Sequence, residues 1–92
     1  MFDRLVEVLR AHKEARLIRK SALFKREWYL DRYPDVKEKK MDPVLHYCRF
    51  GWREGRMPGP DFDSVVYLQI NSDVADADFN PLYHFERYGR SE

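Results

Sequence analysis

The sequence predicts an all-α protein, with an N-terminal amphipathic helix followed by two copies of a 38-residue helix-turn-helix repeat. Residues 24–54 align with residues 62–92 without a gap, and ten of the 31 aligned pairs are identical. Each copy has Asp or Asn before Pro where a helix would begin and Gly where it would end. Residues 2–20 lack both Gly and Pro, as a continuous helix requires. A repeat of this kind is more typical of a binding protein than of an enzyme.

We expect one compact domain with three parts: an amphipathic helix and lead-in at 1–23, the first copy at 24–61 and the second copy at 62–92. The positions expected to maintain the fold recur at the 38-residue offset. They are Phe24, Tyr29, Asp35, Pro43, His46 and Gly51 in the first copy, and Phe62, Tyr67, Asp73, Pro81, His84 and Gly89 in the second.

The N-terminal helix should have two apolar stripes at helical spacing. One contains Phe2, Leu5, Val6 and Leu9 and turns basic at Lys13, Arg16 and Lys20; the other contains Val8, Ala11, Ala15 and Ile18. We expect a capping helix over the open end of the repeat pair. The alternative is a helix for a membrane surface or a partner helix. Its contact residues would be Phe2, Leu5, Val6, Leu9, Arg16, Arg19 and Lys20.

The first half of each copy predicts a helix at 25–32 and at 63–70, with Asp63 as an N-cap. The turns that follow lie at 33–36 and 71–74. Because Pro34 can open a helix but not continue one, a short helical turn should follow, to about residues 39 and 77.

The second half of each copy predicts a helix that Asp42 or Asn80 caps, with Pro43 or Pro81 at its first position. Gly51 and Gly89 are expected to end these helices in the left-handed conformation, with Trp52 closing a Schellman motif in the first copy. The histidines at 46 and 84 are expected to be structural, packing against Met41 or Phe79 and bonding the turn that contains Asp35 or Asp73.

The composition excludes several functional classes. A hydrophobic fraction of 43% and an aromatic fraction of 15% are those of a folded chain. Cys48 is the one cysteine, and Glu86 takes its place in the second copy. We therefore expect the Cys48 side chain to be half exposed, which disfavours a buried catalytic thiol. We expect no catalytic residue, no metal ligand and no cofactor.

Without an apolar run of about 20 residues or a signal-like start, the expected location is the cytoplasm. The alternative is a peripheral position at the inner face of the membrane.

Charge is distributed unevenly along the chain. Residues 1–20 hold six Lys/Arg and three Asp/Glu, a net of +3; residues 21–60 hold nine and six, again +3; residues 61–92 hold two and seven, a net of −5. Such asymmetry can steer head-to-tail contact or attraction to an anionic surface, or simply reflect solvated faces. Nucleic acid is not an expected partner, because the net charge is +1 and no basic stripe interleaves with the aromatics.

Most aromatic side chains should pack in the core, but a few could contact a protein partner or a sugar ring. The candidates are Trp28, Tyr33, Trp52, Arg53 and Tyr88.

The first copy resembles a tandem repeat of large bacterial proteins. The matching residues are Phe24, Trp28-Tyr29-Leu30, Tyr33-Pro34-Asp35-Val36, Asp42-Pro43-Val44-Leu45-His46-Tyr47, Gly51-Trp52 and Glu54-Gly55-Arg56. That repeat accompanies glycosyltransferases of surface-polysaccharide synthesis and is also found in some secreted calcium-binding proteins. The second copy departs from it at Val66 and at Asn71-Ser72. The resemblance, which covers about residues 17–92, implies no catalytic residue.

The expected function is a non-catalytic module that mediates protein association, with itself or with an enzyme domain, beside a polysaccharide-synthesis machinery. One alternative is a carbohydrate-binding module with polysaccharide as its ligand. The other is a peripheral membrane adaptor that acts through the N-terminal helix.

Overall fold

The computed structural model describes residues 4–89 and confirms an all-α protein. In these residues the only β pairing is a single bridge between Gly59 and Phe62. The helices are α1 (Arg4–Ile18), α2 (Arg26–Arg32), α3 (Pro34–Glu38), α4 (Pro43–His46), the π-helical η1 (Tyr47–Gly51) that continues α4, α5 (Ser64–Ile70), α6 (Ser72–Asp76) and α7 (Pro81–Arg87).

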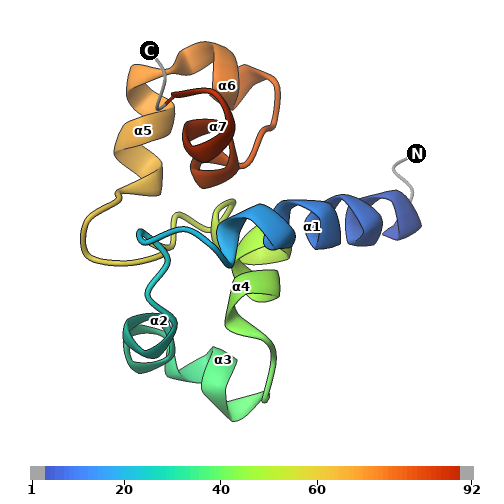
Figure 1. Ribbon diagram of the computed structural model, residues 1–92, viewed down its shortest axis with the longest axis vertical. Helices are drawn as coiled ribbons and strands as arrows, with labels where there is room; N and C mark the ends of the chain where they lie inside the picture. Colours follow the sequence, from blue (N-terminus) through green and yellow to red (C-terminus); the bar gives the residue numbers. More distant parts are fainter. Residues whose placement is uncertain (1–3, 90–92) are drawn as a thin grey trace.

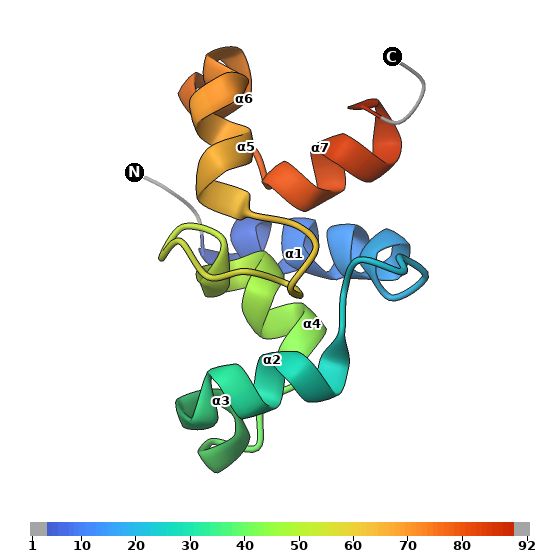
Figure 2. The same ribbon diagram turned by 90° about the vertical axis from the view of Figure 1, so that its left-hand side faces the viewer.

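Helix α1 lies across the middle of the molecule. Figure 1 shows α2, α3 and α4 on one side of it and α5, α6 and α7 on the other, and the turned view in Figure 2 agrees. Helix α1 contacts α4, η1 and α7, whereas the backbones of α4 and η1 do not approach α7. We predicted a cap over an open end, but α1 separates the two helical halves and packs against both.

The second apolar stripe of α1 makes this packing possible. Ala11, Ala15 and Ile18 are at most 2% exposed, so small side chains face the neighbouring helices and allow a close approach. The stripe with Leu5, Val6 and Leu9 lies on the opposite face and is exposed. Phe2, predicted to belong to that stripe, lies outside the described residues.

The first helix and the short helix of each half begin close to the predicted residues. The Asp63 carboxylate caps α5 by accepting hydrogen bonds from the backbone N–H groups of Val65 and Val66, as predicted. Helix α2 starts without a side-chain cap. The turns after α3 and α6 pass through Lys40 and Asp78, with φ of 55° and 53°, in the left-handed region.

The second helix of each half begins as the sequence predicts. The Asp42 side chain accepts from the N–H groups of residues 44 and 45, and the Asn80 side chain accepts from those of residues 82 and 83. Pro43 and Pro81 occupy the first helical turn, where no intrahelical N–H is needed.

The prediction that Gly51 and Gly89 are left-handed helix ends is wrong. Gly55, with φ of 78°, is the one glycine with positive φ among the described residues. Around it the Arg56 N–H donates to the Gly51 carbonyl at 2.9 Å and the Gly55 N–H donates to the Trp52 carbonyl at 3.2 Å. These two bonds form a Schellman motif one turn later than predicted.

Gly51 is required for another reason. A β-carbon there would lie well inside contact distance of the Tyr29 hydroxyl, and at Gly89 it would lie 3.0 Å from the Tyr67 hydroxyl. The glycines therefore provide room for two tyrosine hydroxyls.

Those hydroxyls bond the histidines at 46 and 84. The Tyr29 hydroxyl lies 2.9 Å from Nδ1 of His46, and the Tyr67 hydroxyl lies 2.7 Å from Nδ1 of His84. The expected bonds to the Asp35 and Asp73 turns are thus replaced by bonds to tyrosine, because the tyrosine rings reach the histidines through the space at the glycines. Burial lowers the pKa of His46 and so favours the neutral ring.

Replacing Gly51 by Ala should lower the free energy of unfolding by about 1–3 kcal/mol, because the added methyl group meets a buried, hydrogen-bonded hydroxyl. In a Tyr29→Phe background the loss should be clearly smaller, since the hydroxyl is gone. Urea denaturation of the wild type, the two single variants and the double variant measures both values.

Gly55→Ala is the matched control. It should cost about 1–2 kcal/mol through its left-handed backbone, equally in both backgrounds. A Gly51→Ala loss that is the same with and without the Tyr29 hydroxyl would contradict the steric account.

Candidate functional site

Two N-cap residues on opposite sides of α1 each bind a side chain from that helix or from the residue that directly follows it. Arg19 donates two hydrogen bonds to the Asp42 carboxylate, at 3.3 and 2.6 Å. On the other side, the Asn80 amide donates to the Glu14 carboxylate at 3.1 Å. The aspartate thus faces a cation and the asparagine faces an anion, so the two caps are not interchangeable.

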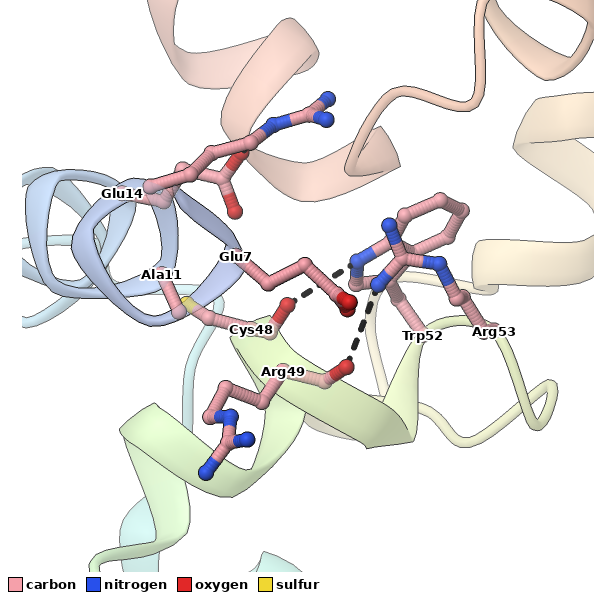
Figure 3. Close-up of a pocket in the computed structure, with 8 residues that line it drawn as sticks. Glu7, Ala11, Glu14, Cys48, Arg49, Trp52 and Arg53 are labelled. Carbon is pink, nitrogen blue, oxygen red and sulfur yellow. Dashed lines mark hydrogen bonds and ion pairs between the residues drawn. The ribbon is translucent and has the colours of Figure 1, made fainter. Parts of the chain in front are cut away.

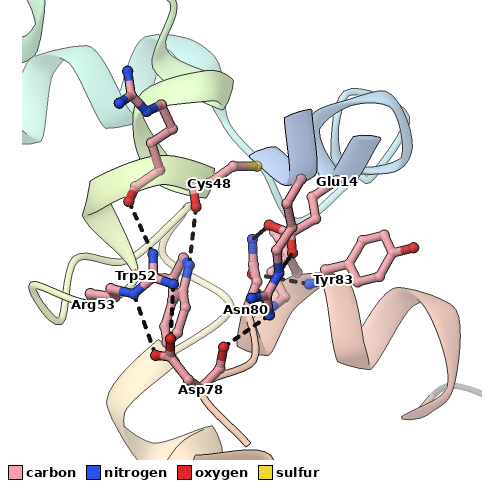
Figure 4. Close-up of polar contacts among 10 residues, drawn as sticks. Glu14, Cys48, Trp52, Arg53, Asp78, Asn80 and Tyr83 are labelled. Atoms are coloured by element: carbon pink, nitrogen blue, oxygen red, sulfur yellow. Dashed lines mark hydrogen bonds and ion pairs between the residues drawn. The ribbon is translucent and has the colours of Figure 1, made fainter. Parts of the chain in front are cut away.

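Further polar contacts surround Glu14 at this junction (Figure 4). Arg10 donates to the Glu14 carboxylate at 3.2 Å and to the Asp78 carbonyl at 2.9 Å. Arg53 reaches across from the end of η1 to the Asp78 carboxylate at 3.1 Å. The loop between α6 and α7 is therefore bonded to α1 and to the first half of the chain.

Glu14 is 4% exposed, and burial raises the pKa of its carboxyl, which the Asn80 hydrogen bond and the Arg10 charge only partly oppose. The cavity beside it, shown in Figure 3, measures about 10 Å³, room for about one water molecule. This space is too small for a substrate beside Glu14, whose carboxylate instead bonds α1 to the cap of α7.

Cys48 also lies at this junction. It is 3% exposed, so the expectation of a half-exposed thiol is wrong. The reason is that α1 covers η1, whereas Glu86 at the equivalent position accepts a hydrogen bond from the Ser21 hydroxyl. Burial raises the pKa of the Cys48 thiol, which keeps it protonated and unreactive.

Two open hollows lie on the surface, one along the second half of α1 and the other beside Arg19, just after α1 ends. The α1–α7 hollow measures about 310 Å³ and is lined by Lys13, Arg16, Leu17, Lys20, Tyr83 and Arg87. The α2–α3 hollow measures about 530 Å³ and is lined by Arg19, Arg26, Leu30, Lys37, Lys40, Met41, Asp42 and Pro43. Among the charged residues cations predominate in both hollows, and most of these cations come from residues 1–60, the part of the chain with a net positive charge.

Large apolar side chains are exposed on two helices. The α1 patch consists of Leu5, Val6 and Leu9, which are 62%, 51% and 60% exposed. The α5 patch consists of Val65, Val66 and Ile70, which are 43%, 44% and 75% exposed. Contiguous exposed apolar side chains are typical of interaction surfaces.

The residues predicted to contact a protein partner or a sugar do not form one surface. Trp52 is 6% exposed and its indole N–H donates to the Cys48 carbonyl, so its ring belongs to the core. Trp28 and Tyr33 are half-buried and pack edge to face, with ring centroids 6.4 Å apart. Arg53 lies over the Trp52 ring, and Tyr88 is 46% exposed at the end of the described chain.

The residues predicted for a membrane or partner helix divide into three groups. Leu5, Val6 and Leu9 form the α1 patch, Arg16 and Lys20 line the α1–α7 hollow, and Arg19 is bonded to Asp42. Sequence reasoning missed Glu14 and Asn80 as a bonded pair. The one signal was the Asp/Asn difference between the two caps.

Within residues 4–89, no His, Cys, Asp and Glu side chains gather in a group of three that could hold a metal ion. None of the helices in these residues has both the length and the hydrophobicity needed to cross a bilayer.

Asn80→Asp should lower the free energy of unfolding by about 2–4 kcal/mol at pH 7, because it places a second buried carboxylate against Glu14. The loss should shrink as the pH falls and the two carboxyls share a proton. Adding Glu14→Gln should restore most of the stability, since the amide and the carboxylate then exchange places. Chemical denaturation at pH 5 and pH 7 tests these expectations.

Asp42→Asn is the matched control, because it also exchanges one good N-cap for the other. It loses only a half-exposed ion pair and should cost about 1 kcal/mol or less. Equal losses for the two exchanges, or no rescue by Glu14→Gln, would show that Glu14 and Asn80 are not coupled.

Comparison of the chain with protein-family models, with curated proteins and with solved structures gave no match.

Proposed function

We propose that this chain is a non-catalytic module for protein association, built from two copies of one helical repeat with α1 between them. The helix boundaries support the repeat, since α5 and α6 begin and end 38 residues after α2 and α3. The internal contacts support it as well. The Phe24 and Tyr29 rings lie 5.3 Å apart, as do the Phe62 and Tyr67 rings, and in each copy the tyrosine hydroxyl bonds a histidine.

The observation that carries the association proposal is the pair of exposed apolar patches on α1 and α5. These side chains contribute little to the core, because the other faces of both helices are the buried ones. Burying an aliphatic side chain at an interface stabilises a complex by about 1.5–3 kcal/mol. Such patches are therefore favourable places for a partner.

The charges next to each patch favour a second copy of the chain as one partner. The α1 patch continues along its helix into Lys13, Arg16 and Lys20, and the α5 patch is followed on α6 by the exposed Asp73 and Asp76. An apolar-basic surface and an apolar-acidic surface are complementary, and they lie on different parts of the same chain. The contact is therefore heterologous, from head to tail.

A contact between two patches of three aliphatic side chains each is expected to be weak and transient, with a dissociation constant of roughly micromolar to millimolar. A position beside a polysaccharide-synthesis enzyme, which the resemblance implies, stays a prediction. The carbohydrate-binding alternative has less support, since Trp52 is buried and the remaining aromatic candidates are dispersed.

Sedimentation velocity over a concentration series tests the association. The wild-type chain should self-associate, and more strongly at low salt because charges contribute. A Leu5→Glu/Leu9→Glu variant and a Val66→Glu/Ile70→Glu variant should each stay monomeric. An equimolar mixture of the two should form a 1:1 dimer, since each variant keeps the patch that the other has lost.

Lys37→Glu, at an exposed position of α3 outside both proposed surfaces, changes the net charge by the same two units as each double variant and should associate like the wild type. A wild-type chain that stays monomeric at millimolar concentration would contradict self-association. If the wild type associates but a mixture of the two patch variants stays monomeric, the head-to-tail arrangement is contradicted.

A further inference from the structure

The α1–α7 hollow has a cationic rim and an uncharged floor. Lys13, Arg16 and Lys20 stand at helical spacing on one face of α1, and Arg87 faces them from α7. All four are exposed, while Tyr83 is 8% exposed and Leu17 is partly buried between them. No acidic residue lines this hollow.

The lack of ion pairs distinguishes this hollow from the other basic surface. In the α2–α3 hollow, Arg19 is paired with Asp42 at 2.6 Å and Arg26 with Glu27 at 2.9 Å. Within the described chain, no ion pair involves the four cations of the α1–α7 hollow. The carboxylate beside Arg87 is that of Glu86, which already accepts a hydrogen bond from the Ser21 hydroxyl.

Four like charges around one concavity repel each other, and an anion bound there would relieve that repulsion. The geometry points to a binding site for a phosphate-bearing ligand between α1 and α7, with Lys13, Arg16, Lys20 and Arg87 as its charged contacts. Lys13, Arg16 and Lys20 also form the basic part of the proposed association surface, but the phosphate site rests on these cations together with Arg87, whereas the association rests on the apolar patches, so either can fail without the other.

The two kinds of cation would contribute differently. The guanidinium groups of Arg16 and Arg87 can each donate two parallel hydrogen bonds to one phosphate, whereas Lys13 and Lys20 act as point charges. The formal charge of +4 suits a dianion or a more highly charged group, such as a phosphomonoester or a pyrophosphate. A volume of about 310 Å³ is at the lower end of the range for small-ligand sites, so the bound group is small.

The phosphate could come from a soluble molecule or from a lipid headgroup. The exposed face of α1 that carries Lys13, Arg16 and Lys20 continues toward the N-terminus into Leu5 and Leu9. If the ligand is a lipid, this apolar part of the same face is where its acyl region would lie.

Isothermal titration of the whole chain with inorganic pyrophosphate at low ionic strength measures the site directly. We expect submillimolar binding that weakens with salt. Arg16→Gln/Lys20→Gln should weaken it about tenfold or more. Arg16→Lys, which keeps the charge but loses the paired donors, should have an intermediate effect. These positions are exposed, and circular dichroism should show an unchanged fold.

Lys37→Gln/Lys39→Gln is the matched control, because it removes the same charge from exposed positions on and just after α3. It should change pyrophosphate binding by less than about twofold. An equal loss in the control would overturn the site by showing that attraction to net charge alone is responsible. The site is also overturned if the wild type binds neither pyrophosphate, at concentrations up to about 10 mM, nor phosphatidic-acid vesicles.

Vesicle flotation distinguishes the two sources of phosphate. Vesicles of phosphatidylcholine with phosphatidic acid should bind the wild type, and Arg16→Gln/Lys20→Gln should abolish that binding. If the source is lipid, Leu5→Ser/Leu9→Ser should weaken vesicle binding and leave pyrophosphate binding intact. If the source is soluble, pyrophosphate should bind and the vesicles should not. Binding to pure phosphatidylcholine that is unchanged by Arg16→Gln/Lys20→Gln would overturn the assignment.

Discussion

The buried hydrogen bond between the Asn80 amide and the Glu14 carboxylate is the constraint on which the arrangement of the helices depends. A carboxylate at 4% exposure is stable only if its hydrogen bonds are made, and its partners come from α1 and from the cap of α7. Because Ala11 and Ala15 bring α1 close to its neighbours, the same helix also covers Cys48 on η1. Helix α1 thus packs between α4–η1 and α7, whose backbones do not approach each other.

The sequence predicted well those features that local chemistry controls. The caps at Asp42, Asp63 and Asn80 and the prolines after two of them define helix starts, because a side-chain acceptor or a missing N–H acts within one turn. The errors concern distant contacts. Gly51 appeared to be a helix end, but its partner is a hydroxyl 22 positions earlier in the chain. The orientation of α1 could not be predicted either, since both of its stripes are apolar and only the packing selects the one with alanines.

The candidate functional surfaces follow from that orientation. Since the alanine stripe faces inward, α1 presents Leu5 and Leu9 near its start and Arg16 and Lys20 near its end to the outside. The apolar part is where we propose that a second copy of the chain binds, and the basic part lines a hollow that α7 completes. The sequence predicted the basic stripe but not the contribution of Arg87, because nothing local places α7 beside α1. The two halves of the chain share their internal tyrosine–histidine bonds and differ at the surfaces where we propose that a partner or ligand binds.

Native-state hydrogen exchange, followed by mass spectrometry across a urea series, tests most directly the claim that α1 holds the two halves together. If α1 connects them through Glu14 and Asn80, the amides of α2 to η1 and those of α5 to α7 should open in one cooperative step with the same free energy. Two separate opening steps, with one half still protected while the other exchanges at the rate of an unfolded chain, would contradict this account.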